Sequence, residues 1–135
     1  MSGITIEVPI RVRYADTDRM GVVYYGTYPT YFEIARTEYM RQRGFTYRRL
    51  EEEGYFLVVV EMVVKYYDTA TYDDLLIVRT SLSELRSRAL SFDYMIMKGG
   101  RCIAEGKTYH VCVNREKRVV QLPPHFLGIL RDGRA

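Results

Sequence analysis

Two carboxylates, Asp16 and Asp18, lie just upstream of a segment that can begin a helix near Thr27. A carboxylate can act as a general base or as a nucleophile. The free N–H groups at a helix start can polarise a carbonyl or hold an oxyanion. Acyl transfer needs such a base or nucleophile beside an oxyanion donor. One carboxylate can therefore face a ligand while the other braces the loop.

The spacing of these carboxylates does not decide between chemistry and local structure. Taken alone, a spacing of two favours an Asx-type turn, in which both side chains only stabilise the loop. Apolar neighbours would raise the basicity of a carboxylate by excluding water. These neighbours are Met20, Val22, Val23, Tyr24 and Tyr25.

Other catalytic signatures are missing from the sequence. It holds no nucleophile elbow, no phosphate-binding glycine loop and no C-x-x-C motif. His110 and His125 are the only imidazoles, and neither has ligand residues at metal spacing. We interpret His110 as a structural histidine on a strand, with its hydrogen bonds satisfied. We therefore expect no metal and no cofactor.

The elements that must position the two carboxylates follow from periodicity. Residues 4–14 alternate and predict a strand whose apolar face runs from Ile4 to Tyr14, and residues 16–27 predict a loop. Thr27 can cap the following helix, which ends near Gly44. The apolar stripe of this helix comprises Tyr28, Tyr31, Phe32, Ala35, Tyr39 and Met40.

The remainder of the chain predicts mainly strands. The pattern indicates a short helix at 47–53, strands at 55–67, 75–85, 90–98 and 102–114, and a short terminal helix. Residues 119–122 either prolong or follow the last strand. The expected fold is α+β, a single domain over residues 1–135 in which a five-stranded antiparallel sheet wraps one long helix. Because one helix covers few strands, we expect the sheet edge to pair with another copy, in a dimer at least.

Composition excludes several function classes. The 135 residues suit one domain, and 47% apolar with 27% charged residues is typical of a globular protein. Of the net charge of +3, none comes from the first 114 residues, which hold fifteen basic and fifteen acidic side chains. This balance argues against a nucleic-acid groove. The longest uncharged stretch, 20–32, is too short and polar to span a bilayer.

The two cysteines indicate the redox state of the cellular compartment. Cys102 and Cys112 are separated by an even number of residues, so we expect both on one face of one strand, too far apart to pair. The sequence also lacks a recognisable signal peptide. We therefore expect reduced thiols and a cytoplasmic location.

Several motifs together resemble a known family. The first runs from Arg13 to Tyr24 and contains Asp16, Asp18 and Gly21, and the second runs from Tyr28 to Arg36. With three downstream matches, they resemble the hotdog-fold thioesterases of the 4-hydroxybenzoyl-CoA thioesterase family, including acyl-CoA thioesterases associated with the Tol-Pal system. The resemblance covers residues 5–123 in order. The downstream matches are Tyr72–Asp74, Glu84–Phe92 and Ala104–Gly106.

The resemblance implies a fold, an activity and a site. It implies a helix wrapped by the sheet, dimers or tetramers with active sites between subunits, and hydrolysis of an acyl-CoA to a carboxylic acid and free CoA. Asp18 would be the nucleophile, through a mixed anhydride, or the general base on water. The backbone N–H of Tyr25 would hold the oxyanion, and Gly21 would let the loop turn close to the thioester. Arg86, Ser87 and Arg88 would meet the CoA phosphates, unless they form only a solvated hairpin end.

The chain departs from the family at some positions. Tyr25 and Thr27 replace the His and Asn of many Tol-Pal-associated members, which puts an imidazole-assisted step in doubt. We interpret Glu33 as a brace near Arg36 rather than a catalytic group. A hotdog dehydratase is disfavoured because no His precedes His110. A non-catalytic acyl-CoA binding protein or scaffold stays as the alternative.

Overall fold

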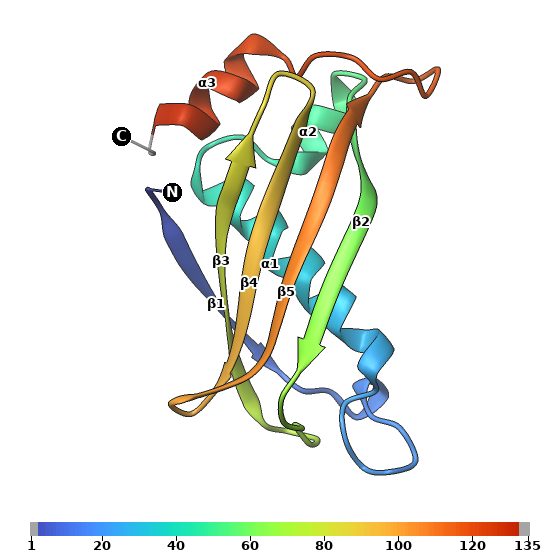
Figure 1. The fold of residues 1–135 in the computed structure, drawn as a ribbon, viewed down its shortest axis with the longest axis vertical. Coiled ribbons are helices and arrows are strands. Elements are labelled where there is room, and N and C mark those ends of the chain that lie inside the picture. The colour runs from blue at the N-terminus through green and yellow to red at the C-terminus, as the bar shows by residue number, and fades with distance from the viewer. Residues whose placement is uncertain (1–2, 133–135) are drawn as a thin grey trace.

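The computed structural model describes residues 3–132, which form a five-stranded antiparallel sheet with helices on one face (Figure 1). The strand order is β1-β3-β4-β5-β2. The strands are β1 (Thr5–Arg11), β2 (Phe56–Tyr66), β3 (Leu75–Leu85), β4 (Ala89–Lys98) and β5 (Arg101–Val113). The helices are α1 (Tyr28–Gln42), α2 (Tyr47–Glu52) and α3 (Pro124–Asp132). The predicted α+β architecture, with its order of elements, is confirmed.

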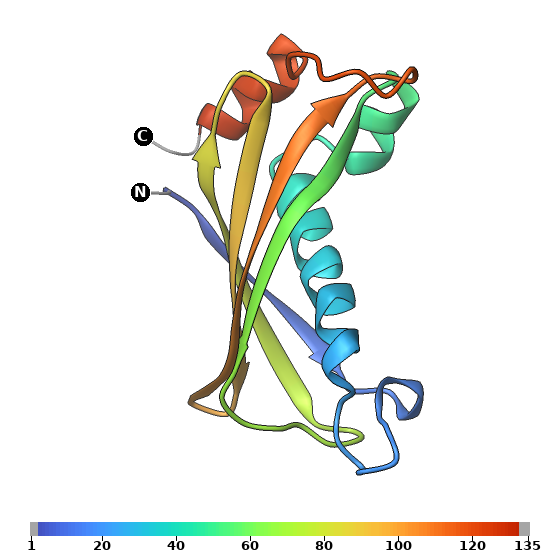
Figure 2. The ribbon, with the colours of Figure 1, turned by 45° about the vertical axis from the view of Figure 1, so that its right-hand side comes forward.

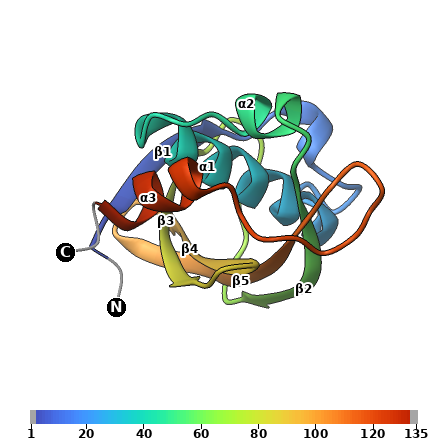
Figure 3. The same ribbon diagram turned by 90° about the horizontal axis from the view of Figure 1, so that it is seen from above.

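Helix α1 lies diagonally across the concave face of the sheet (Figures 2 and 3). All six residues of its predicted apolar stripe are buried. The Phe32 ring stacks on Tyr94 of β4 at a centroid distance of 4.3 Å. A Cβ atom on Gly106 of β5 would overlap the Phe32 ring, so the close approach of α1 to the sheet requires glycine there. This contact fixes where the helix begins, and hence where the loop before it lies.

The two ends of α1 form as the sequence predicts, except for the cap. Thr27 is the N-cap residue, but its hydroxyl accepts no hydrogen bond from the first turn and instead donates to the carbonyl oxygen of Asp16 at 3.3 Å. A 3-10 turn, η2 (Tyr25–Thr27), leads into the helix in place of a side-chain cap. Gly44 ends the helix with a φ of +95°, in the left-handed region that favours glycine.

Two predictions about strand faces are wrong. The apolar face of β1 ends at Val12, because the chain turns into the 3-10 helix η1 (Tyr14–Asp16) and leaves Tyr14 79% exposed. Cys102 and Cys112 do not share a face. The β4–β5 register pairs Ile96 with Ala104 but Met97 with Cys102, so an extra residue in β5 reverses the alternation. Both cysteines are free.

The two edge strands differ in how well they are protected. Strand β1 is seven residues long, contains Pro9 and carries charged side chains, which are features that discourage edge pairing. Strand β2 has eleven residues without proline and is exposed along most of its length. Its side chains Val59, Met62 and Tyr66 share a face with the core residues of β5 yet remain more than 40% exposed. Helix α1 covers them only in part, through the Tyr28 ring, whose centroid lies 5.1 Å from that of Tyr66. The uncovered surface of the fold therefore lies on β2.

Candidate active site

The segment from Arg13 to Tyr25 folds back on itself as a small antiparallel ladder. The Asp18 N–H donates to the Val22 carbonyl at 2.9 Å, and the Tyr24 N–H donates to the Asp16 carbonyl at 2.9 Å. Gly21 makes the reversal with a φ of +80°, and its N–H donates to the Asp18 carbonyl. A side chain at Gly21 would meet no atom within 4 Å, so the glycine is required by backbone conformation rather than by space. This ladder pairs Asp18 with Val22 and Asp16 with Tyr24, so both carboxylates lie on the short loop that leads into η2.

Asp16 is the structural member of the carboxylate pair. Its side chain is 3% exposed and accepts hydrogen bonds from the Arg13 backbone, the Arg13 guanidinium and the Tyr31 hydroxyl, at 2.8–3.2 Å. Burial would raise the pKa of this carboxyl, but the hydrogen bonds from Arg13 and Tyr31 outweigh it and hold the pKa below its usual value. Asp16 therefore ties the loop to α1, which is the bracing role expected for one of the two carboxylates.

Asp18 lies on the outer side of the same loop and is half-buried. Its Oδ1 accepts a hydrogen bond from the Met20 N–H at 2.9 Å, so the Asx-type turn considered from the spacing is present. Within residues 3–132, its Oδ2 accepts no hydrogen bond. The carboxylate thus keeps acceptor capacity that Asp16 has used up.

The start of η2 supplies a backbone donor on the same loop as Asp18. Tyr25 is its first residue, and its N–H has no acceptor among the residues that the structure describes. The Tyr25 carbonyl accepts a hydrogen bond from the Tyr66 hydroxyl at 2.9 Å, which ties this peptide to the end of β2. Sequence reasoning missed Tyr66, because the hydrogen bond joins residues 41 positions apart.

The expected apolar enclosure of Asp18 does not form within one chain. Of the five neighbours named for it, Val23 alone is buried, whereas Met20 is 82% and Tyr25 65% exposed. The Tyr24 and Tyr25 rings contact each other at a centroid distance of 4.6 Å and line the open side of the loop. The interpretation of Tyr28 and Tyr31 as packing residues is consistent with their burial.

The three residues assigned to the CoA phosphates lie far from Asp18. Val12 donates its N–H to the Asp74 carbonyl and accepts from the Asp73 N–H near the start of β3, which places the Asp18 loop at that end. Arg86, Ser87 and Arg88 instead form the turn after the last residue of β3. Eleven strand residues separate the two ends by about 33 Å. Figure 1 shows the loop at the lower end of the sheet and the β3–β4 turn at the upper end. One chain therefore does not bring the two groups together.

The two arginines of this turn also differ in their surroundings. The Arg86 guanidinium pairs with Glu84 at 3.0 Å and lines a hollow beside the outward-facing Tyr109 of β5. Arg88 lines a separate groove between α2 and the segment after β5. No ion pair among the described residues involves Arg88.

Two other sequence interpretations are corrected by the structure. Glu33 is exposed, and no ion pair in the described part of the chain joins it to Arg36, which instead donates to the Tyr94 hydroxyl at 3.5 Å. His110 is buried, but only half satisfied. Its Nε2 lies 2.8 Å from the Thr108 hydroxyl, while its Nδ1 has no partner. Burial, with a smaller contribution from Arg36, lowers the pKa of His110 to about 4, so the ring is neutral near pH 7.

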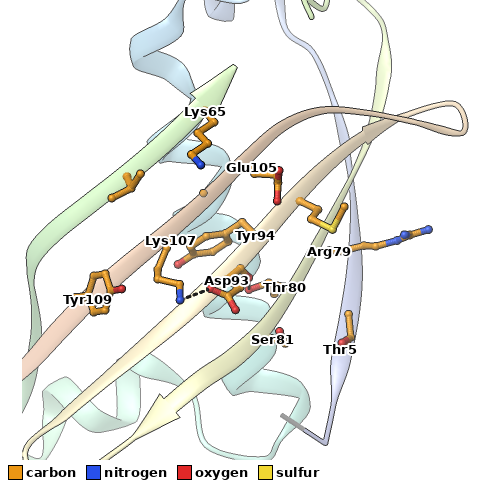
Figure 4. Close-up of a pocket in the computed structure, with 13 residues that line it drawn as sticks. Thr5, Lys65, Arg79, Thr80, Ser81, Asp93, Tyr94, Glu105, Lys107 and Tyr109 are labelled. Carbon is orange, nitrogen blue, oxygen red and sulfur yellow. Dashed lines mark hydrogen bonds and ion pairs between the residues drawn. The ribbon is translucent and has the colours of Figure 1, made fainter. Parts of the chain in front are cut away.

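A hollow of about 730 Å³ lies on the outer face of the sheet, away from α1 (Figure 4). None of the candidate catalytic residues lines it. Its charges are largely paired, with Lys107 bound to Asp93 at 3.2 Å and Arg79 to Glu7 at 2.7 Å. Nothing at this surface provides a base beside a free backbone donor. Between residues 3 and 132, no three His, Cys, Asp or Glu side chains are grouped so as to hold a metal ion.

Comparisons with known proteins identify the family of the chain. A model of the thioesterase-like superfamily matches residues 12–130. The acyl-CoA thioesterase YbgC of Haemophilus influenzae is 38% identical over 110 residues, which cover 81% of each chain.

Solved structures match over most of the chain as well. A hypothetical protein from Thermus thermophilus superposes with a TM-score of 0.90 at 38% identity, covering 93% of this chain and 96% of the other. A DHNA-CoA thioesterase from Staphylococcus aureus superposes with a TM-score of 0.85 at 30% identity, covering 87% and 80%. The chain belongs to the thioesterase-like superfamily and is a hotdog-fold thioester hydrolase.

Proposed function

We propose that the protein is an acyl-CoA thioesterase in which Asp18 is the catalytic residue and the backbone N–H of Tyr25 holds the oxyanion. The observation that carries the proposal is that one short, braced loop holds both an incompletely bonded carboxylate and a free N–H at a helix start. The related proteins named for acyl-CoA and DHNA-CoA hydrolysis support CoA thioesters as the substrate class.

The reaction needs one attack on the thioester carbonyl. As general base, Asp18 takes a proton from water, the hydroxide attacks the carbonyl carbon, and the C–S bond breaks. The proton held by Asp18 then passes to the leaving thiolate, which departs as CoA thiol. As nucleophile, the Asp18 oxygen attacks instead and expels CoA thiolate to form a mixed anhydride. Water then hydrolyses the anhydride, which regenerates the carboxylate and supplies the proton of the thiol. In both routes negative charge develops on the carbonyl oxygen, where a preorganised N–H donor stabilises the transition state.

The separation of Asp18 from the β3–β4 turn supports a site shared between two copies. Strand β2 is the long, unprotected edge, and antiparallel pairing of two β2 strands would continue the sheet across a twofold axis. A twofold axis perpendicular to the sheet exchanges the two ends of the sheet. It would bring the β3–β4 turn of the partner to the end that carries Asp18, and it would cover Val59, Met62 and Tyr66. We propose a homodimer of this form, or a tetramer built from two such dimers, to be distinguished by the light-scattering mass.

The compartment is also part of this proposal. No helix among residues 3–132 has the length and apolarity needed to cross a membrane. Two free cysteines fit a reducing environment, and we propose that the enzyme acts in the cytoplasm.

The direct test is thiol release from a panel of aromatic, short and long aliphatic acyl-CoA substrates by the wild type and by Asp18→Asn. We expect at least 100-fold loss of kcat with little change in KM, since the amide preserves shape but cannot act as base or nucleophile. Asp73→Asn is the matched control, because Asp73 is an exposed aspartate in a nearby turn. Full activity of Asp18→Asn would remove Asp18 from the mechanism. Tight acyl-CoA binding by the wild type without thiol release across the panel would contradict the enzyme.

A further inference from the structure

Three hydrogen bonds hold the backbone around the proposed oxyanion donor, the Tyr25 N–H. The Tyr24 N–H donates to the Asp16 carbonyl at 2.9 Å, and the Tyr24 carbonyl accepts from the Thr27 N–H at 2.8 Å. The third bond comes from the last residue of β2, since the Tyr66 hydroxyl donates to the Tyr25 carbonyl at 2.9 Å. The peptide groups on both sides of the Tyr25 Cα atom are therefore anchored, one by the loop itself and the other by β2.

The Tyr66 bond takes the place of one that the helix cannot make. In a continuous α-helix the Tyr25 carbonyl would accept from the N–H four residues later. That residue is Pro29, which has no N–H. The Tyr66 hydroxyl supplies a donor instead. Partial burial raises the pKa of the Tyr66 phenol above its usual value, so the hydroxyl keeps the proton that it donates. The Tyr25 peptide is thus restrained from outside its own loop.

The Tyr66 ring is itself held by buried aromatic residues. Its centroid lies 5.1 Å from that of Tyr28, and the ring planes meet at 89°, which is the edge-to-face arrangement that aromatic pairs prefer. Tyr28 is 2% exposed and lies 5.9 Å, centroid to centroid, from Tyr31. The Tyr31 hydroxyl in turn donates to the Asp16 carboxylate. One row of tyrosines therefore connects the brace at Asp16 to the Tyr25 peptide, and Tyr66 is its last member.

We propose that Tyr66 is a positioning residue for the oxyanion donor, because its hydroxyl fixes the orientation of the Tyr25 peptide and hence the direction of the N–H. The inference rests on the proposed function and adds to it a residue that acts only through the backbone of Tyr25. A backbone donor stabilises the developing charge only if it already points at the oxyanion. The loss of such an interaction lowers kcat more than it raises KM, since the charge develops only in the transition state. In the proposed dimer the pairing of two β2 edges would cover Tyr66, and a hydrogen bond shielded from water is stronger.

Removal of the hydroxyl alone tests this role. Tyr66→Phe keeps the ring against Tyr28, so we expect the fold to be unchanged. For the acyl-CoA of the panel that is hydrolysed fastest, kcat should fall at least 5-fold, with KM within twofold. Tyr67→Phe is the matched control, because Tyr67 is the next residue and its hydroxyl also makes one hydrogen bond, to Glu105 at 2.6 Å, which involves no residue of the loop. We expect kcat of Tyr67→Phe to stay within twofold of the wild type.

The carbonyl stretch of a bound substrate measures the strength of the oxyanion donor directly. The same acyl-CoA, labelled with carbon-13 at its carbonyl, is bound to Asp18→Asn so that it is not hydrolysed. Its infrared band should lie at lower frequency than that of the free thioester, because a hydrogen bond polarises and weakens the C=O bond. We expect this shift to be at least halved in Asp18→Asn/Tyr66→Phe and unchanged in Asp18→Asn/Tyr67→Phe.

Turnover by Tyr66→Phe equal to that of the wild type would overturn the positioning role while leaving the thioesterase intact. A fall in kcat with an unchanged carbonyl band would also overturn it, since Tyr66 would then act on something other than the oxyanion donor. An acyl-CoA that the wild type binds but does not hydrolyse would instead refute the proposed function. In that case the carbonyl band of the bound thioester, compared between the wild type and Tyr66→Phe, still decides whether the hydroxyl positions the Tyr25 N–H.

Discussion

The inner and outer sides of the loop between β1 and α1 carry the same residue type in opposite environments. Asp16, on the inner side, is buried and accepts from a guanidinium, a backbone N–H and a tyrosine hydroxyl. Asp18, two residues later, is half-exposed and accepts one N–H from its own turn. Asp16 closes the 3-10 turn η1, where Arg13 and Tyr31 reach its carboxylate, whereas Asp18 follows that turn and precedes the reversal at Gly21.

The difference explains how one short segment can combine rigidity with reactivity. A carboxylate whose lone pairs are all engaged stabilises the loop but has no capacity left for a substrate. A carboxylate with a free oxygen can accept a proton or attack a carbonyl, provided that its loop does not move. We infer that Asp16 holds the loop in the geometry that Asp18 needs. The variants below measure the stabilising role of Asp16 and the reactivity of Asp18 separately.

The largest effect is expected on stability, from removal of the inner carboxylate. Asp16→Ala leaves the Arg13 N–H and the buried Tyr31 hydroxyl without their acceptor, and each buried donor left unsatisfied costs roughly 1–3 kcal/mol. Asp18→Ala removes one hydrogen bond at a half-exposed turn and should cost less than about 1 kcal/mol. Urea unfolding of the three proteins gives both values. Equal losses of unfolding free energy for the two variants would show that Asp16 is no more important than Asp18 for the stability of the loop.

Acid titration should reveal the same division. The pKa of Asp16 is lower in the folded protein, so the folded state binds fewer protons than the unfolded state as pH falls through the ordinary carboxyl range. Its contribution to stability is therefore present above the unfolded pKa of about 3.9 and is lost as pH falls toward the lower folded value. In Asp16→Asn the free energy of unfolding should depend less steeply on pH below about 4 than in the wild type, as measured by urea unfolding at pH 2–7.

The titration of His110 also changes the stability with pH, and its effect must be distinguished from that of Asp16. His110 is neutral and buried, with a folded pKa of about 4, so it destabilises the fold as pH drops from about 6.5 to 4. Its effect therefore ends where that of Asp16 begins. His110→Gln should flatten the upper window alone, and a change below pH 4 in that variant would mean that the two groups are coupled.

The elements of the fold were predictable because each depends on local patterns. The stripe from Tyr28 to Met40 has helical spacing, and all of its members are buried. The turns at Gly44 and Gly99 both have positive φ, as their residue type indicates. Tyr14 was assigned to the strand because it continues the alternation. The bond between Arg13 and Asp16 instead favours a 3-10 turn, and this bond is not visible as a period.

The composition of the site was less predictable, because it depends on contacts between distant residues. The sequence indicates that one of two carboxylates braces the loop, but the Tyr31 contact that makes this Asp16 becomes clear only when α1 is in place. The link from Tyr66 to Tyr25 joins residues 41 positions apart. The extra residue in β5 that turns Cys102 away from Cys112 has no local signature.

A modest expected effect on stability, at Gly21, separates the turn from the chemistry. Gly21 and Gly44 both have a positive φ, +80° and +95°, and a side chain at either position would meet no atom within 4 Å. Alanine at either site should therefore destabilise the protein by the same amount, about 1 kcal/mol, through backbone strain alone. Only Gly21→Ala should also reduce kcat, by at least 10-fold, because strain there is relieved by moving the loop that holds Asp18, whereas Gly44 ends α1 far from it. Thioesterase assays and urea unfolding on both variants make the comparison. A loss of stability in both without a loss of turnover in Gly21→Ala would mean that the loop tolerates movement, and that Asp18 does not depend on the geometry that Asp16 maintains.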